Sequence, residues 1–247
     1  MVKKREFTAF GSKREASMEG LIDNVTKNIR QTFNHLETKC QGLQEELEKV
    51  RDSLFPAVHA FVQLLEGRDL FTYGHSRRVA RYSVQFAGHL GWSVDKIKLL
   101  NVAALLHDIG KIIIPDSVLL KNGKFSVLEY ETMKLHSSTG SRIINRLGFW
   151  GAEVEEWILH HHERFDGKGY PDGIKGDSIP IGARILSLAD SYDAMTTTRR
   201  YREPIPHWVA LDEITTCGGR QFDPDLANEF QVAFPESPKL EDTLENT

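Results

Sequence analysis

The sequence has few cysteines and no long apolar run, and both shortages limit the class of protein that it encodes. Its two cysteines, Cys40 and Cys217, lie far apart and form no CxxC motif, so we expect no disulfide framework. No apolar stretch approaches the ~18 residues of a membrane span, and no apolar h-region follows the basic start of the chain. We therefore expect neither a membrane span nor a secretory signal, and the cytoplasm is the expected compartment.

A strong excess of one charge is also missing. The 31 basic and 35 acidic residues leave a formal net charge of −4, which argues against a general affinity for DNA or for anionic membranes. Hydrophobic residues make up 40% of the chain and charged residues 27%, the balance of a soluble globular protein. A chain of 247 residues has room for one good-sized domain and an extension.

Alternation with period two, the pattern of half-buried strands, is scarce in the second part of the chain. Apolar residues recur there at three- and four-residue steps, as in Val79, Tyr82 and Phe86. This pattern predicts an all-α domain, with a short hairpin near 112–125 and a helix C-cap at Gly110. The predicted helices cover residues 57–66, 75–90, 94–108, 126–147, 152–163, 181–197 and 208–216, with a short one after 224.

A heptad repeat precedes this domain. Its positions follow steps of four and three and are apolar except for Thr26: Ile22, Thr26, Ile29, Phe33, Leu36, Cys40, Leu43, Leu47, Val50 and Leu54. Such a seam predicts a coiled coil that forms a homodimer and relays a signal. The alternative is a long amphipathic helix that lies on its own domain. Pro56 is expected to kink this helix or to mark its end.

Four segments follow from these patterns. Residues 1–20 mix charged and small residues without periodicity and are expected to be flexible. We predict a coiled-coil signalling helix over 21–56, a helical domain over 57–235 and a disordered tail over 236–247.

Histidines and aspartates lie at the ends and faces of the apolar helices. A single histidine on such a helix is more often a hydrogen-bonded core residue than a metal ligand. Several on different helices share one interior, however, and this favours a site for Fe, Mn, Zn or Co. An aspartate there can bridge two cations, and paired metals about 3.5–4 Å apart activate water against a phosphodiester. The side chains concerned are His75, His107, Asp108, His136, His160, His161, His162 and Asp190.

Two basic features accompany these residues. Lys111 follows Asp108 closely; alone it would be a lysine favoured by the dipole of a helix C-terminus. Beside a centre that hydrolyses phosphodiesters it would instead neutralise the charge of the transition state. The cluster at 199–202, RRYR, is either a solvated face or a set of partners for an anionic substrate.

Together with HD at 107–108, the residues HHERFDGKGYP at 161–171 resemble the HD-GYP family. These are bacterial cyclic-dinucleotide phosphodiesterases, a branch of the HD metal-dependent phosphohydrolase superfamily. The similarity runs from about residue 68 to 230 and implies an HD-type helical bundle over 57–235 as the catalytic domain. The other motifs that carry it are YGHSRRVA (73–80), AALLHDIGKIIIPDSVLLKNGK (103–124), LHSSTG (135–140), ARILSLADSYDAMTTTRRYR (183–202) and GGRQFDP (218–224).

The resemblance also implies roles for single residues. Lys111 is the catalytic lysine, and Asp108 is both a catalytic residue and the carboxylate that bridges the metals. The implied metal ligands are His75, His107, Asp108, His136, His161, His162 and Asp190, whereas His160 lies outside the motif. Residues expected to contact the substrate are Arg199, Arg202, Tyr170 and Gly169, although position 202 is often Lys in the family.

Two glycines and one phenylalanine refine this picture. Gly167 and Gly169 are expected to permit a positive φ in the GYP loop. Some members of the family carry a glutamate four residues before the first metal histidine and hold three metals. Phe71 occupies that position here, so we expect two divalent ions, Fe or Mn in the first place and Zn, Ni or Co as alternatives.

The activity implied by the resemblance is hydrolysis of cyclic di-GMP to 5′-pGpG, by a water or hydroxide that bridges the metals. A second cut to GMP is left open. One alternative substrate is 3′,3′-cyclic GMP-AMP, and another is a different nucleotide cut by an HD phosphohydrolase reaction. Two non-catalytic functions also fit the sequence. One is a cyclic-dinucleotide sensor that docks on a diguanylate cyclase domain, and the second is a structural adaptor built around the rod.

Overall fold

The computed structural model describes residues 3–68, 74–198 and 203–236, and the side chains before residue 26 are not described. Within these ranges the chain is helical and contains no β-strand, so the all-α prediction is confirmed. None of the described helices is both long and apolar enough to cross a membrane. Contacts divide the chain into two units, Met1–Pro56 and Ala57–Thr247.

Helix α1 runs from Lys3 to Glu66 and continues through Pro56. Residues 3–20 belong to this helix, and their Lys, Arg, Glu and Ala have high helix propensity. The expected flexibility of residues 1–20 stays a prediction. The described apolar heptad positions are exposed, from 64% for Ile29 to 37% for Leu54. An exposed apolar stripe of this kind is what a coiled-coil helix presents before it pairs.

The second unit contains eight further described helices. Seven of them lie within a few residues of a predicted helix, the short helix at 116–119 was not predicted, and the helix predicted over 57–66 is the end of α1. The eight helices are α2 (His75–His89), α3 (Val94–Leu106), α4 (Asp116–Leu119), α5 (Val127–Leu147), α6 (Gly151–His160), α7 (Ile181–Thr196), α8 (His207–Thr216) and α9 (Pro224–Ala233). Two short 3-10 turns join them, η1 (Ile109–Ile113) and η2 (Gly176–Ser178).

Polar caps account for several of these helix boundaries. Ser126 and Glu129 form a reciprocal capping box at the start of α5, and Gly148 ends that helix with a φ of 69°. At α9 the carboxylate of Asp223 accepts hydrogen bonds from the first backbone N–H groups, and Pro224 occupies the first turn.

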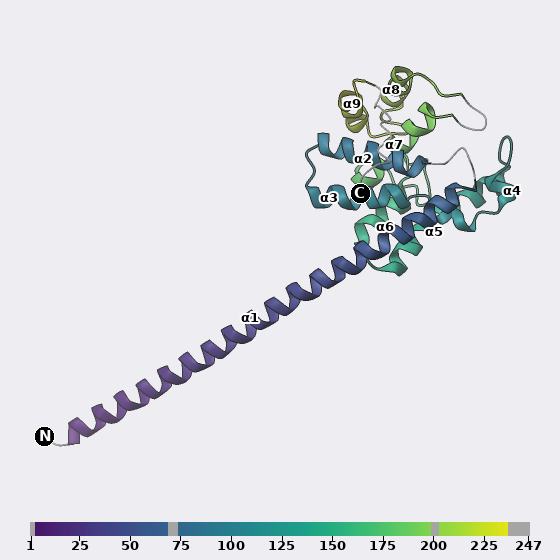
Figure 1. Ribbon diagram of the computed structural model, residues 1–247. Coiled ribbons are helices and arrows are strands. Elements are labelled where there is room, and N and C mark those ends of the chain that lie inside the picture. The colour runs from purple at the N-terminus through teal and green to yellow at the C-terminus, as the bar shows by residue number, and fades with distance from the viewer. Residues whose placement is uncertain (1–2, 69–73, 199–202, 237–247) are drawn as a thin grey trace. The chain divides into compact units, whose positions relative to one another are not determined.

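The helices of the second unit pack against one another around one shared interior. Helix α2 packs on α3 and α7, α3 packs on α6, and α6 packs on α5 and α7 (Figure 1). Aromatic pairs hold α2 to its neighbours: the rings of Tyr82 and Tyr192 lie 5.0 Å apart, as do those of Phe86 and Phe230. This packing turns the ends of α2, α3 and α6 and the middles of α5 and α7 toward each other.

The segment after α3 differs from its prediction. Helix α3 ends at Leu106 with His107 as its C-cap, and η1 and α4 replace the hairpin expected near 112–125. Gly110 is therefore not the cap of α3. A Cβ atom at this position would lie 1.9 Å from the carbonyl oxygen of His136, so the glycine lets the backbone of η1 touch that of α5.

Candidate metal centre

Asp108 lies where polar side chains from five helices, α2, α3, α5, α6 and α7, converge. Its Oδ1 is 3.6 Å from Nε2 of His136. Its Oδ2 is 3.4 Å from Nε2 of His107 and 3.9 Å from Nε2 of His75. The two oxygens of one carboxylate thus face two different groups of histidines, which is the arrangement of a carboxylate between two cations.

Three of the imidazoles are oriented by the backbone of their own helices. The Nδ1 atoms of His107, His136 and His161 each lie 2.7 Å from the carbonyl oxygen three residues earlier. A carbonyl only accepts, so each Nδ1 donates the hydrogen bond. Burial lowers the pKa of His136 and of His161, so these two rings are neutral and each has a lone pair on Nε2. The two Nε2 atoms face each other at 3.4 Å with no hydrogen between them, and a cation bound there would satisfy both.

The adjacent His161 and His162 directly follow α6, with His161 as its C-cap, and their ring centroids lie 4.0 Å apart. Burial, reinforced by the neighbouring imidazoles, holds the pKa of His161 well below its usual value and lowers the pKa of His162 to about 3. Both rings are therefore neutral at pH 7, the form in which histidine binds metals.

His75, the first residue of α2, lies between two carboxylates of α7. Its Nε2 is 3.2 Å from Oδ1 of Asp190, and its Nδ1 is 2.7 Å from Oδ2 of Asp193. Burial alone would lower the pKa of His75, but the hydrogen bonds of the two carboxylates outweigh it and raise the pKa to about 9. The environment thus favours a positive charge at this point, either a proton or a metal ion.

Asp193 was not predicted from the sequence. Its side chain is 1% exposed, and its Oδ1 accepts a hydrogen bond of 2.7 Å from Nε of Arg78. A buried carboxylate that holds the outer nitrogen of a ligating histidine is the usual outer-shell partner of a metal site. Asp190 and Asp193 lie three residues apart on one face of α7, so helix periodicity does not distinguish the inner carboxylate from the outer one, and only the family resemblance pointed to Asp190 as the ligand.

The donor set fits divalent ions. Among the described residues, two groups of three side chains have ligand atoms within 4.8 Å of one another, and Asp190 adjoins the second group through His75. Imidazole nitrogens with a minority of carboxylate oxygens suit first-row transition metals better than Ca²⁺ or Mg²⁺. The groups are His136, His161 and His162, and His75, His107 and Asp108.

A cation already lies beside the shared carboxylate. Nζ of Lys111, in η1, is 2.5 Å from Oδ2 of Asp108. Burial would raise the pKa of Asp108, but Lys111 and then the surrounding imidazoles outweigh it and hold the pKa well below its usual range. Asp108 is therefore an anion available to cations from both sides.

The GYP loop, residues 166–178, contacts this centre through Tyr170. The ring of Tyr170 lies 4.9 Å from that of His162. Gly167 has a φ of 76°, as expected, but Gly169 has no positive φ. Gly169 is required for space instead, because a Cβ there would lie 2.4 Å from the backbone nitrogen of Arg164. The buried Glu163 holds the far side of the loop by accepting hydrogen bonds from the two backbone N–H groups that follow Pro171.

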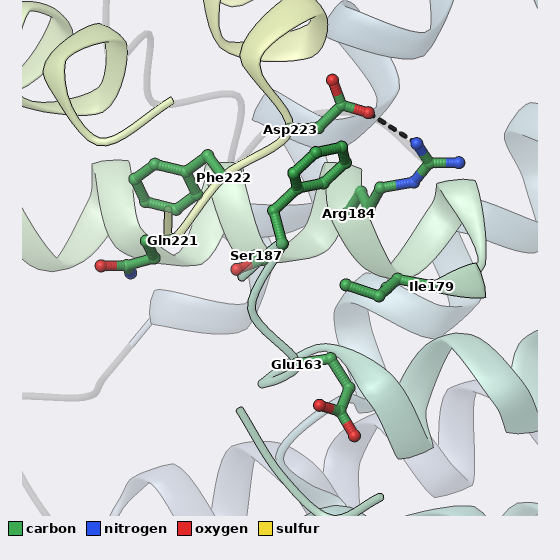
Figure 2. A pocket seen from close by; sticks show the side chains of 8 residues that line it. Glu163, Ile179, Arg184, Ser187, Gln221, Phe222 and Asp223 are labelled. Atoms are coloured by element: carbon green, nitrogen blue, oxygen red, sulfur yellow. Dashed lines mark hydrogen bonds and ion pairs between the residues drawn. The ribbon is translucent and has the colours of Figure 1, made fainter. Parts of the chain in front are cut away.

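A small pocket lies beside this loop, and none of the predicted site residues lines it. Its volume of about 10 Å³ has room for one water molecule. Figure 2 shows Arg184 and Asp223 facing each other there, with a separation of 2.6 Å, and the carboxylate of Glu163 pointing away from them. The pocket therefore belongs to the packing of the loop against α7 and α9. Its lining is Glu163, Phe165, Ile179, Arg184, Ser187, Gln221, Phe222 and Asp223.

Other predicted residues lie elsewhere. Arg199, Arg202 and Phe71 fall outside the described residues. His160, which the resemblance placed outside the ligand set, makes a contact of 3.0 Å with Asp172 and takes no part in the two groups.

Comparisons with known proteins show the family of this chain. The HD domain family matches residues 59–226. A cyclic di-GMP phosphodiesterase of Thermotoga maritima is 40% identical over 212 residues, 84% of this chain and 56% of that protein. The 3′3′-cGAMP-specific phosphodiesterase 2 of Vibrio cholerae is 34% identical over 207 residues, 83% of this chain and 38% of that protein.

A solved structure supports the fold. Bd1817, an HDG"Y"P protein of Bdellovibrio bacteriovorus, superposes with a TM-score of 0.55 at 21% identity and covers 66% of this chain and 52% of its own. The chain spans only about 38% to 56% of the length of the two curated relatives above.

Proposed function

This chain belongs to the HD domain family. We propose that it is a member of the HD-GYP branch of that family and a metal-dependent phosphodiesterase that hydrolyses cyclic di-GMP to 5′-pGpG. The observation that carries the proposal is the division of the two Asp108 oxygens between separate histidine groups. A carboxylate that is only 11% exposed is costly unless it is paired or binds a cation, and Lys111 neighbours only one of its two oxygens.

The proposed ligands divide into two sets that share Asp108. His75, His107 and Asp190 would complete one set, and the three histidines of α5 and α6 would complete the other. Two divalent ions, Fe or Mn with Zn, Ni or Co as alternatives, would supply the chemistry by lowering the pKa of a water held between them and by polarising the phosphoryl oxygens.

Lys111 has a separate role in this proposal. Its ammonium group lies next to Asp108 and its side chain is 28% exposed, so the group can turn from the carboxylate toward a bound phosphate. There it offsets the charge that develops on the equatorial oxygens as water attacks phosphorus. Tyr170 and Gly169, with Arg199 and Arg202, are proposed to hold the substrate.

A second substrate is favoured by one specific comparison. The relative from Vibrio cholerae with 34% identity is named for 3′3′-cGAMP. Both cyclic dinucleotides carry the same pair of phosphodiester bonds, so the metal centre suits either, and the choice rests on contacts with the bases.

We also propose that α1 pairs with a second copy of the chain. The exposed apolar stripe from Ile29 to Leu54 supports this, because a partner helix would remove these side chains from water. Sedimentation at micromolar concentration should show a dimer, and a monomer would exclude the pairing.

The test of the proposed function separates metal binding from catalysis. Asp108→Ala should lose bound metal and activity, whereas Lys111→Met should keep the metal and lose about 10²–10³-fold in kcat. Asp95→Ala, at a position that is 92% exposed at the start of α3, is the matched control and should retain both. Elemental analysis of anaerobically purified protein gives the metal content, and circular dichroism checks the fold.

Chromatography of reactions with cyclic di-GMP and with cyclic GMP-AMP gives the substrate and its products. Activity at the wild-type level in Asp108→Ala would refute the metal centre. Failure of metal-loaded wild-type protein to cut either dinucleotide would refute the substrate assignment.

A further inference from the structure

An aromatic surface extends from the metal centre to the exterior of the second unit. The ring of Tyr170 lies 4.9 Å from that of His162 and 6.4 Å from that of His136. On its other side Tyr170 meets Tyr130 of α5, with centroids 6.3 Å apart and planes at 83°. Tyr130 is 47% exposed, so part of its ring is open to a ligand that reaches out from the metal centre.

A lysine lies over both tyrosines. Nζ of Lys134 is 4.7 Å from the ring centroid of Tyr130 and 5.7 Å from that of Tyr170. Glu131 holds this ammonium group at 2.7 Å and raises the pKa of Lys134, so the group is charged at neutral pH. The result is a cation held at a defined place between two aromatic rings, one turn along α5 from Tyr130.

We infer that Tyr130 and Lys134 form a nucleotide subsite, in which the ring stacks with one purine base of the substrate and the ammonium group binds the phosphate or the base edge beside it. The inference rests on the proposed function, because it assumes that a phosphodiester of a cyclic dinucleotide lies at the metal centre. The metal centre contacts only one phosphate of such a molecule. The bases of the dinucleotide must then lie on the surface around the metal centre, where Tyr170 and Tyr130 are located.

The chemistry of the two side chains suits this ligand. Aromatic rings stack with any base, because every base has a π face. A lysine donates to phosphate oxygens and to the O6 and N7 acceptors of guanine. The simpler interpretation is that Lys134 only stabilises α5 by its contact with the ring of Tyr130. That interpretation predicts a loss of stability and no loss of ligand affinity when the ring is removed.

The experiment compares two substrates of the same protein. Cyclic di-GMP requires contacts with its bases, whereas bis(p-nitrophenyl) phosphate carries a phosphodiester without a purine and reports on the metal centre. In Tyr130→Ala we expect the ratio of kcat/KM for cyclic di-GMP to kcat/KM for bis(p-nitrophenyl) phosphate to fall about 5- to 150-fold, the value of one stacked base. Lys134→Met should lower the same ratio, and Tyr130→Phe should restore it.

Leu128→Ala is the matched control, since Leu128 is on the same helix and 77% exposed. It should leave the ratio unchanged. An unchanged ratio in Tyr130→Ala would overturn the subsite if the wild-type protein cuts cyclic di-GMP.

Failure of the proposed function is distinguishable from failure of the subsite. Calorimetry with 5′-GMP, a mononucleotide with the same base, measures the subsite without turnover. If the wild-type protein cuts no cyclic dinucleotide but binds GMP more tightly than Tyr130→Ala does, the proposed function falls and the nucleotide subsite stands. If in that case the two proteins bind GMP equally, or neither binds it, both fall.

Discussion

Replacement of Asp193 by asparagine tests whether the outer hydrogen bond of a histidine sets the affinity of one metal ion. Asp193 is buried, and its carboxylate lies 2.7 Å from Nδ1 of His75 and 2.7 Å from Nε of Arg78. Asparagine keeps the shape of the side chain and removes its charge. His75 then keeps its place in α2 but loses the carboxylate that fixes the orientation of its ring. That carboxylate also makes Nε2 a stronger metal ligand.

The expected magnitude follows from these contacts. Loss of an outer-shell partner of a metal ligand typically lowers metal affinity about 10–100-fold, or about 1.4–2.8 kcal/mol. The change also removes an ionic partner of Arg78, and breaking a buried pair costs about 3–5 kcal/mol. The side chain of Arg78 is 19% exposed, so solvent reduces this cost and we expect the lower end of that range.

The assay is a titration of metal-free protein with Mn²⁺ or Zn²⁺ in competition with a chelator. His75 belongs to one of the two candidate groups, and the other group lies on α5 and α6. Asp193→Asn should therefore weaken one of two bound ions about 10–100-fold and leave the affinity of the other within about threefold.

Asp223→Asn is the matched control, because Asp223 is a buried acid that also pairs with an arginine, Arg184 (Figure 2). It takes no part in either group of candidate ligands. This variant should lower the melting temperature and leave both metal affinities unchanged. Equal weakening of both ions in Asp193→Asn, or no weakening of either, would refute the reasoning. Arg78→Lys, which keeps the charge, serves as the second variant if Asp193→Asn does not fold.

Two further predictions concern α5 and the turn that touches it. Gly110→Ala should destabilise the protein by about 3 kcal/mol or more, because its Cβ would lie 1.9 Å from the carbonyl oxygen of His136 and backbone atoms must move; an unchanged thermal melt would contradict this close approach. Glu129 has its pKa lowered to about 2, first by its hydrogen bond with Lys121 and then by those of the capping box. Because this pKa is depressed, the stabilisation is present above about pH 4.5 and is lost as the pH falls through 2. An NMR titration of the carboxyl group checks the value, and Glu129→Gln should abolish this part of the pH dependence.

Much of the fold follows from local patterns in the sequence. Apolar steps of three and four residues locate the helices, and Ser126 and Asp223 mark two of their starts, because a helix face and a cap depend only on residues within one turn. The same locality explains the errors. Nothing within a few residues of Gly110 indicates that the backbone of α5 lies against it, so a glycine needed for contact resembles a glycine that ends a helix.

For the candidate site, too, one part could be predicted from the sequence and another part depended on the tertiary structure. The sequence by itself determined which polar side chains stand at the ends and faces of apolar helices, since burial of such groups requires a partner whatever the fold. Only the tertiary structure decided how they pair. His75 and Asp193 are 118 positions apart, and the packing of α2 on α7 makes Asp193 the outer partner of the imidazole and Asp190 the inner one. The two aspartates occupy one face of one helix, and their roles differ only because a second helix approaches that face from one side.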